Sequence, residues 1–467
     1  MPSEGSLDIS KVRSFFPSLS SETPYIYADN AGGSQCCQPV IDRIVDYLSN
    51  SNVQPHGDYS MSKISTDRVN LGKETAKILF NASSGHEITF GSSSTILLEN
   101  LARAVEGDLG GEDEIIVTGE HEANAGPWRR LAKRGGLEVR YWHVTPIKGS
   151  SNPYAVAHDV NTLLPLITKN TRIVAITACS NILGSVVDVK SVVKQIRAKV
   201  AEKGAKKVEI SVDCVAYAPH RKMDVRDWDV EYAVFSFYKR SQVYGPHIAA
   251  LYTRFSTLPN LTPLTHHSPL PLDKKSYKLM PGGPGHELPY GVTGVLEYLL
   301  SISPIPGPTS SASLSEPGSI YCDPETHTRL EATFAAIAKY EHTLVKRMLE
   351  QLTSERFAKR GVRIVGEGAA SERRQPTIAF VVVNGETGNV ISGKDIVRVF
   401  DAKGNMGIRY GNFFAYTLDT LNPRVNVNNG LVRISLVHYN TIEEVDRLVE
   451  VLDEALGVQL GRQRPRL

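Results

Sequence analysis

Short apolar runs alternate with helical patterns through most of the chain, and this alternation is the feature that most restricts the possible folds. Runs typical of strands occur at residues 115–117, 139–142, 173–177, 208–214, 233–239 and 248–252. Helical patterns such as residues 189–203 lie between them. Strands that are apolar throughout and separated by helices are typical of a parallel sheet covered on both faces. The sequence therefore predicts an α/β fold whose ligands bind beyond the carboxyl ends of the strands.

One of these strands ends in a lysine. The run that begins at Ala233 leads to Lys239, and a turn at residues 244–247 follows. Burying an ammonium group is costly, so the pKa of such a lysine falls and a neutral, nucleophilic amine becomes available. That amine forms a Schiff base with an aldehyde, and the commonest protein-bound aldehyde is pyridoxal phosphate (PLP). The alternative is a lysine whose charged end extends into solvent from the end of a strand.

Two segments upstream of Lys239 favour the cofactor hypothesis. Strand 208–214 contains Asp213, and an aspartate there can keep the pyridine nitrogen of PLP protonated, which makes the ring an electron sink. Residues 87–95 run from a strand into a helix through Ser92-Ser93-Ser94-Thr95, and small hydroxyl residues at a helix start offer donors to a phosphate. A serine run alone is more often a plain N-cap. A phosphate loop, an aspartate and a lysine on successive strand ends are much harder to obtain by chance.

Several motifs along the chain resemble those of a known family. The motifs are Asp29-Asn30-Ala31, Glu120-His121-Glu122-Ala123-Asn124 with Pro127-Trp128, Ser180-Asn181-Ile182-Leu183-Gly184, and Val432-Arg433-Ile434-Ser435-Leu436. Together they are similar to the motifs of the fold type I PLP enzymes of aminotransferase class V, and within that group to the cysteine desulfurase-like proteins. The resemblance covers nearly the whole chain. It implies a large domain with a seven-stranded, mostly parallel sheet, a smaller C-terminal α+β domain, and a homodimer with its sites at the subunit boundary.

The resemblance also implies roles for individual residues. Lys239 would bind PLP and later move protons at the substrate carbons, and His121 would stack on the cofactor ring as the second catalytic residue. Arg433 would pair with the substrate α-carboxylate, with help from Arg409. The other expected cofactor contacts are Asp213 at the pyridine nitrogen, Asn181 at the phenolic oxygen, Ser94, Thr95 and Ser236 at the phosphate, Tyr238 beside the lysine, and Gly283 through its backbone N–H from a partner subunit. Asn30 and His56 are expected on the substrate side, although both residue types are equally typical of turns and loops.

The chain departs from the family pattern where the desulfurase cysteine belongs. Phe414 stands at that place, and the sequence contains no cysteine after Cys322. A persulfide needs a thiolate close to the substrate sulfur. We therefore expect no sulfur transfer through a cysteine of this chain, on the assumption that Cys179 and Cys214 are small buried core residues. Three further replacements are Tyr238 for a histidine, Ala216 for a Gln or His, and Gly283 for a hydroxyl residue.

The remaining chemistry is PLP-dependent bond cleavage or formation at the β-carbon of a small amino acid. The favoured reaction is β-decarboxylation of aspartate with C–C bond formation to an aldehyde co-substrate, as in fungal members of the family that act as decarboxylative aldolases. Phe413, Phe414 and Tyr416 would suit a dry pocket for a carbon electrophile. The alternatives are sulfur release from cysteine or a cysteine conjugate, and an aminotransferase or epimerase reaction. A scaffold without activity is disfavoured because the lysine, the aspartate and the arginine are all present.

Composition and segment boundaries complete the prediction. The chain has 467 residues, of which 41% are hydrophobic, and a formal net charge of +2, so a large core is expected and nucleic acid is not an expected partner. No apolar run reaches membrane-spanning length, and the five cysteines show no disulfide or metal-ligand spacing, so we expect a reduced cytoplasmic protein without a metal. The expected parts are an N-terminal segment (1–30) that joins the small domain, a large PLP-binding domain (31–300), a flexible loop (301–322) and the small domain (323–467).

Overall fold

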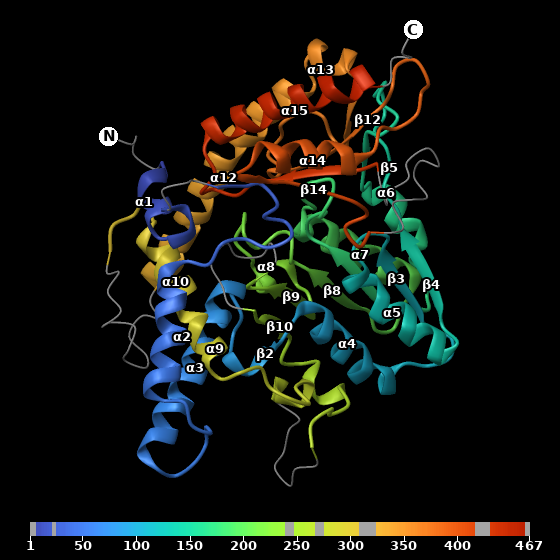
Figure 1. Ribbon diagram of the computed structural model, residues 1–467. Coiled ribbons are helices and arrows are strands. Elements are labelled where there is room, and N and C mark those ends of the chain that lie inside the picture. The colour runs from blue at the N-terminus through green and yellow to red at the C-terminus, as the bar shows by residue number, and fades with distance from the viewer. Residues whose placement is uncertain are drawn as a thin grey trace.

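The computed structural model describes residues 6–20, 25–238, 247–266, 275–307, 324–415 and 430–462 (Figure 1). Lys239, Tyr416 and most of the loop predicted at residues 301–322 lie outside the described residues. No helix in the described part of the chain is long and apolar enough to cross a bilayer.

A seven-stranded sheet forms the centre of the larger half, as predicted. Its strand order is β2 (Ile88–Gly91), β10 (Ala249–Thr253), β9 (Tyr232–Ser236), β8 (Glu209–Asp213), β7 (Thr171–Thr177), β3 (Glu114–Thr118) and β4 (Glu138–Trp142). Neighbouring strands are parallel except for β10, which is antiparallel to both of its neighbours. The mostly parallel α/β sheet expected from the apolar runs is therefore confirmed.

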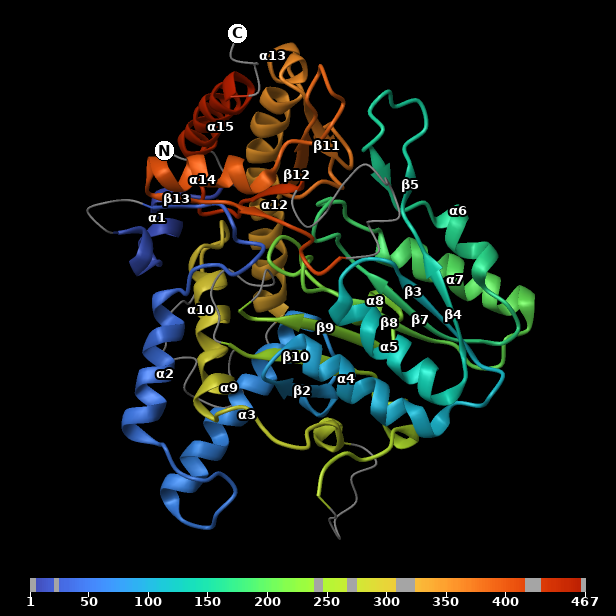
Figure 2. The same ribbon diagram turned by 45° about the vertical axis from the view of Figure 1, so that its right-hand side comes forward.

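Helices cover both faces of this sheet, because successive side chains of each strand point to opposite sides. On one face Val117, Ala175 and Val234 pack with α4 (Ser94–Val105) and α5 (Glu122–Gly135), around the fully buried Trp128 (Figure 2). On the other face the cluster includes residues of α3 (Ser60–Phe80), α7 (Val189–Lys203) and α10 (Thr293–Ser301). The remaining elements of this half are α2 (Gln38–Asn50), α6 (Val160–Leu163), α8 (Val225–Trp228), α9 (Glu287–Gly291), and the short pair β5 (Thr145–Pro146) and β6 (Val156–Ala157).

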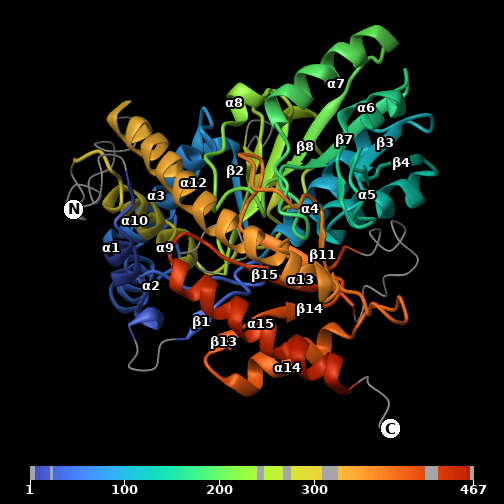
Figure 3. The ribbon, with the colours of Figure 1, turned by 90° about the horizontal axis from the view of Figure 1, so that it is seen from above.

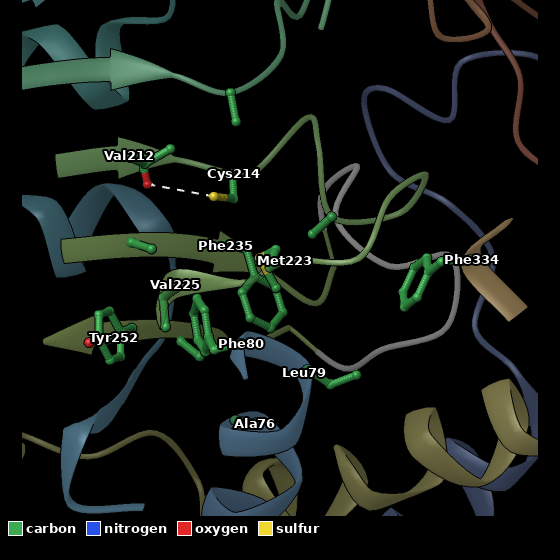
Figure 4. Packing of buried hydrophobic residues seen from close by; sticks show 14 of the residues in the cluster. Ala76, Leu79, Phe80, Val212, Cys214, Met223, Val225, Phe235, Tyr252 and Phe334 are labelled. Carbon is green, nitrogen blue, oxygen red and sulfur yellow. Dashed lines mark hydrogen bonds between the residues drawn. The ribbon is translucent and has the colours of Figure 1, made fainter. Parts of the chain in front are cut away.

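The packing on this second face includes a group of aromatic rings in close contact. Phe80 at the end of α3 meets Phe235 of β9 with ring centroids 4.7 Å apart, and Tyr252 of β10 lies beside them (Figure 4). Cys214 is buried in the same cluster, and its Sγ lies 3.8 Å from the carbonyl oxygen of Val212. Its position is that of the small buried core residue expected from the sequence.

A four-stranded antiparallel sheet forms the centre of the smaller half. Its order is β11 (Val362–Val365), β12 (Thr377–Val382), β15 (Val432–Ser435) and β14 (Arg409–Tyr410), and it packs with α12 (Pro324–Leu352), α13 (Glu355–Lys359), α14 (Gly393–Lys403) and α15 (Ile442–Arg462). The chain start contacts both halves. Val12 of α1 (Ile9–Ser14) lies in the core of the large half, and β1 (Ile26–Tyr27) pairs in parallel with β13 (Met406–Gly407) (Figure 3). Asp29 then forms a parallel bridge with Ser435. The N-terminal segment therefore lies against the end of β15. The domain boundaries themselves stay a prediction.

The long helix α12 connects the two halves through a buried carboxylate. Its first part, including Leu330 and Phe334, belongs to the core of the large sheet, whereas its last turns belong to the core of the small sheet. Glu341 lies between them with 1% of its side chain exposed. Both of its oxygens lie 2.9 Å from Nδ1 of His220, and one lies 3.7 Å from Nδ1 of His438. His438 Nε2 lies 3.1 Å from the hydroxyl of Tyr298 on α10.

Removing the Glu341 carboxylate should destabilise the protein. Burial alone raises the pKa of Glu341, but His220 and His438 outweigh that effect and lower it to about 2. A carboxyl with a lowered folded-state pKa contributes stability above its unfolded pKa and loses it as the pH falls from about 4.5 towards 2. We expect Glu341→Gln to cost about 3 kcal/mol at pH 7, measured by urea unfolding. The cost should shrink below pH 4.5.

The exposed Glu350 on the same helix provides the matched control. Glu350→Gln should change the free energy of unfolding by less than about 0.5 kcal/mol. Equal effects of the two substitutions, or a Glu341→Gln cost that stays constant between pH 7 and pH 3, would contradict an ionic role for Glu341.

Candidate active site

A cavity of about 370 Å³ lies between the carboxyl ends of the large sheet and the edge of the small sheet. Its walls are Ala31, Gly32, Ser94, Thr95, His121, Ala123, Thr177, Cys179, Asn181, Asp213, Val215, Ala216, Arg409, Tyr410, Gly411, Asn412, Phe413, Phe414 and Arg433. Seven of the residues expected from the sequence therefore line one cavity: Ser94, Thr95, His121, Asn181, Asp213, Arg409 and Arg433. Its position agrees with the rule that open α/β sheets bind ligands at the carboxyl ends of their strands.

Asp213 supplies a buried carboxylate to this cavity. It is the last residue of β8, aligned with Thr177 of β7 on one side and Val234 of β9 on the other, and it is 5% exposed. Its Oδ1 accepts a 2.9 Å hydrogen bond from the backbone N–H of Val215, which fixes the orientation of the carboxylate. A fixed, buried carboxylate suits a protonated ring nitrogen.

The N-terminus of α4, which follows the edge strand β2, also lines the cavity. Ser93 is the N-cap, and its Oγ accepts a hydrogen bond of 3.2 Å from the N–H of Ile96. Ser94 and Thr95, the first two residues of this 12-residue helix, line the cavity. The serine run thus contains an N-cap, as the simpler hypothesis proposed. It also presents the start of a helix to the cavity, which suits a phosphate.

His121 is held in a defined orientation by its own helix. It is the N-cap of α5, and its Nδ1 accepts a 3.1 Å hydrogen bond from the N–H of Ala123. Nδ1 therefore carries no proton, and in the neutral ring the proton lies on Nε2. The imidazole lines the cavity with its centroid 5.7 Å from that of Phe414. His121 is thus a half-buried wall residue rather than a surface histidine.

Arg433 is the buried cation of the site. It lies on β15 with 3% of its side chain exposed, and its guanidinium lies 4.0 Å from the ring centroid of Phe413. Nη1 donates to the carbonyl oxygen of Asn181 at 3.3 Å. Burial lowers the pKa of Arg433 to about 10, against the opposing effect of Asp29, so the group stays charged at neutral pH. A buried guanidinium of this kind binds a ligand carboxylate well.

Asn181 makes a hydrogen bond that the sequence did not predict. Its Nδ2 donates to the carbonyl oxygen of Phe413 at 2.9 Å, which joins the loop after β7 to the loop after β14. Its expected contact with the cofactor's phenolic oxygen stays a prediction.

Asp29 is a functional candidate that sequence reasoning missed. Its Oδ1 accepts a 2.9 Å hydrogen bond from Arg433 Nη2, and its Oδ2 accepts one of 2.6 Å from Arg409 Nε. One internal carboxylate therefore bridges both arginines expected to bind substrate. The only indication in the sequence was its place beside Asn30 in a motif, where it was given no role of its own.

Two of the expected substrate-side residues do not reach the cavity. Asn30 is 2% exposed, and its Nδ2 donates to the carbonyl oxygens of Tyr27 (2.6 Å) and Ser435 (3.0 Å). Its Oδ1 accepts from the hydroxyl of Tyr439, so the amide joins the N-terminal segment to β15 rather than facing a ligand. His56 is exposed in the loop between α2 and α3, with φ +68°, away from this cavity. The expectation of substrate contacts is wrong for both within this chain.

The residues that flank Lys239 lie near the cavity but do not line it. Ser236 is the buried last residue of β9. The ring of Tyr238 stacks on that of His247 with centroids 3.4 Å apart, and its hydroxyl lies so close to Gly33 that a Cβ there would be 3.1 Å away. Gly283 is exposed in the segment before α9, and its expected contact with a partner subunit stays a prediction.

The assumption that no other cysteine reaches the site is wrong for Cys179. This residue follows β7 by two positions and lines the cavity, although it is only 2% exposed. Its Sγ lies 3.0 Å from Oε1 of Gln375 in the small half. The pattern of apolar residues around Cys179 indicated burial correctly, but it could not indicate that the buried side faces a cavity.

The loop that carries Phe414 has a costly backbone. Phe413 and Phe414 both adopt left-handed conformations, with φ of 52° and 58°, which cost about 1 kcal/mol or more each in a non-glycine residue. The carbonyl of Phe414 accepts a 2.8 Å hydrogen bond from the N–H of Glu122 at the start of α5. The Phe414 side chain stays 54% exposed at the cavity. Such strain persists where the surroundings fix it, and it is typical of functional loops.

Comparison with known proteins identifies the family. The family model described as "Aminotransferase class-V" matches residues 26–274 and 327–448, and the chain belongs to this family. It is 33% identical over 97% of its length to the aminotransferase-like protein FGM3 of Gibberella zeae, of which it covers 100%. It is 28% identical, again over 97% of its length, to the cysteine desulfurase-like protein ustD of Aspergillus flavus, of which it covers 92%.

Solved structures show the same fold. A cysteine desulfurase of Thermococcus onnurineus superposes with a TM-score of 0.75 at 21% identity, covering 96% of this chain and 98% of that one. The cysteine desulfurase CsdA of Escherichia coli superposes with a TM-score of 0.73 at 23% identity, covering 97% and 99%. The large parallel sheet with its smaller antiparallel sheet is therefore the fold of cysteine desulfurase structures.

Replacing Arg433 should weaken carboxylate binding. In Arg433→Lys a point charge replaces a planar group that stacks on Phe413 and donates in several directions. We expect the Kd of L-aspartate and of L-cysteine to rise about 10- to 100-fold, measured by spectroscopic titration. Arg447→Lys, at an exposed arginine of α15, should leave both values unchanged. An unchanged Kd in Arg433→Lys would place the carboxylate elsewhere.

Proposed function

We propose that the protein is a PLP-dependent lyase that acts at the β-carbon of aspartate, removing the β-carboxylate and joining that carbon to an aldehyde. The observation that carries this proposal is the pairing of a buried carboxylate-binding cation, Arg433, with two phenylalanines where a desulfurase would have its cysteine loop. Arg433 would bind the α-carboxylate of the substrate. Phe413 and Phe414 would surround the β-carbon with apolar surface.

Several residues that line the cavity are of the types that would hold PLP. When bound, PLP takes up the electron pairs released as bonds to the amino acid break. Asp213 would hold the ring nitrogen, the start of α4 at Ser94 and Thr95 would hold the phosphate, and His121 would cover the ring face. The amine of Lys239 would carry the cofactor. A fixed buried carboxylate and a helix N-terminus in one cavity support this assignment.

The phenylalanine loop would keep water away from the β-carbon. In the proposed reaction the bond from Cβ to its carboxylate breaks and CO₂ leaves. The electron pair of that bond forms the new bond to the aldehyde carbon, whose oxygen takes up a proton. Water would compete by protonating the same carbon, so an apolar wall at this point favours C–C bond formation.

One observation favours the alternative of C–S cleavage. Cys179 lines the cavity, so a thiol is present even though Phe414 occupies the usual cysteine position. The thiol lies beside Gln375 in a buried environment, which does not favour a thiolate. C–S cleavage is therefore the second candidate. An aminotransferase or epimerase reaction would need the same cofactor groups. Its products would distinguish it from both the decarboxylation and the C–S cleavage.

The test is product analysis on the purified protein. With PLP, we expect an absorbance band of lysine-bound cofactor that Lys239→Ala abolishes and that the exposed-lysine control Lys346→Ala preserves. With L-aspartate and an aliphatic or aromatic aldehyde, mass spectrometry should detect a γ-hydroxy amino acid with loss of CO₂. With aspartate alone, alanine should form more slowly.

Other products would overturn the proposal. Sulfide from L-cysteine that is lost in Cys179→Ser would establish the C–S alternative. Conversion of an added 2-oxo acid into its amino acid, in amounts equal to the keto acid formed from aspartate, would establish an aminotransferase. No absorbance band in the wild type with added PLP would exclude all three reactions.

A further inference from the structure

We propose that Asp29 limits the site to one ion-paired carboxylate, and thereby leaves the second carboxylate of a dicarboxylic substrate without a cation. This inference rests on the proposed function, because it assumes that Arg433 binds the substrate α-carboxylate. It adds a specificity-determining residue to the reaction and explains how one site could bind aspartate without protecting its β-carboxylate.

The geometry shows that Asp29 already neutralises one positive charge. Arg409 and Arg433 are the guanidinium groups among the described residues that line the cavity. The carboxylate of Asp29 accepts hydrogen bonds from Nε of Arg409 at 2.6 Å and from Nη2 of Arg433 at 2.9 Å. The two arginines and Asp29 together carry a net charge of +1, which matches one substrate carboxylate.

Arg433 is the more buried of the two arginines, with 3% of its side chain exposed. Its Nε is buried and has no hydrogen-bond partner among the described residues. Arg409 is 57% exposed and donates its Nε to Asp29. Because desolvated pairs interact more strongly than exposed ones, the α-carboxylate would take the buried Arg433.

Asp29 is fixed in place by the backbone around it. The carbonyl oxygen of the preceding residue, Ala28, accepts a 2.7 Å hydrogen bond from the N–H of Ser435. The carbonyl oxygen of Asp29 accepts a 2.8 Å hydrogen bond from the N–H of Gly32. A Cβ at Gly32 would lie 2.6 Å from Asp29 Oδ2, so a larger residue there would displace the carboxylate. The surrounding backbone therefore holds the Asp29 carboxylate in a fixed position between the two arginines.

A second substrate carboxylate would meet aromatic surface instead of a cation. Phe413, Phe414 and Tyr410 line the same cavity, and the faces of aromatic rings carry partial negative charge. A carboxylate without a cation in such a place is destabilised relative to water. Losing it as neutral CO₂ removes that penalty, whereas an ion pair with Arg409 would stabilise the carboxylate and oppose its loss.

The experiment compares succinate with butyrate, which have the same chain length and differ by one carboxylate. Binding to the PLP-loaded protein is measured by isothermal titration calorimetry. We expect the wild type to bind both with Kd values within about threefold. Asp29→Asn should free Arg409 and raise the preference for succinate about tenfold. The double variant Asp29→Asn/Arg409→Ala should return to the wild-type ratio, and Asp58→Asn, at an exposed aspartate, should not change it.

Two outcomes would overturn the inference. One is a wild type that prefers succinate tenfold and loses that preference in Arg409→Ala, since Arg409 would then already bind the second carboxylate. The other is an unchanged ratio in a folded Asp29→Asn. If Asp29→Asn is unstable, the single variant Arg409→Ala still tests the inference. This variant should leave the ratio of the succinate and butyrate Kd values unchanged.

Succinate and butyrate do not react, so a failure of this inference can be distinguished from a failure of the proposed function. A gain for succinate in Asp29→Asn supports the charge-limiting role even if aspartate gives no product in the wild type. If aspartate does react, Asp29→Asn should lower both the KM for aspartate and the kcat for CO₂ release. A fall in kcat with an unchanged KM would point to a merely structural effect.

Discussion

The buried Glu341 carboxylate links the two halves of the protein, between which the cavity lies. His220 follows Asp213 by seven residues and His438 follows Arg433 by five, so the histidines that share Glu341 are close in sequence to the two most buried charged groups of the site. Each half of the protein supplies only one wall of the cavity. The large sheet supplies Asp213 and the start of α4, and the small sheet supplies Arg433. The helix α12, which has residues in both cores, is one of the links between these walls.

Internal ion pairs then determine what the cavity can bind. Its charged groups are already partly balanced, since Asp29 bridges Arg409 and Arg433. A site that is preorganised in this way does not need to rearrange its charges when a ligand enters. Under the role proposed for Asp29, this balance would also restrict the ligand, because the net charge of the three groups matches one substrate carboxylate.

The sequence was sufficient for the large sheet and for most of the cavity wall. Apolar runs located the strands, and the carboxyl ends of parallel strands meet at one edge, so the local pattern alone could place Asp213, Asn181 and the start of α4 together. Asn30, Cys179 and Asp29 could not be placed, because their neighbours come from segments hundreds of positions away. Asn30 contacts Ser435, Cys179 contacts Gln375, and Asp29 contacts Arg433. Local pattern carries no information about such pairs.

The phenylalanine loop is held at the cavity by two hydrogen bonds. Asn181 donates to the carbonyl oxygen of Phe413, and the backbone N–H of Glu122, beside His121, donates to the carbonyl oxygen of Phe414. Two consecutive left-handed residues are costly, and these bonds offset that cost. Under the proposed function, an apolar ring at this place in the cavity would favour chemistry on carbon, where exclusion of water matters more than a thiolate.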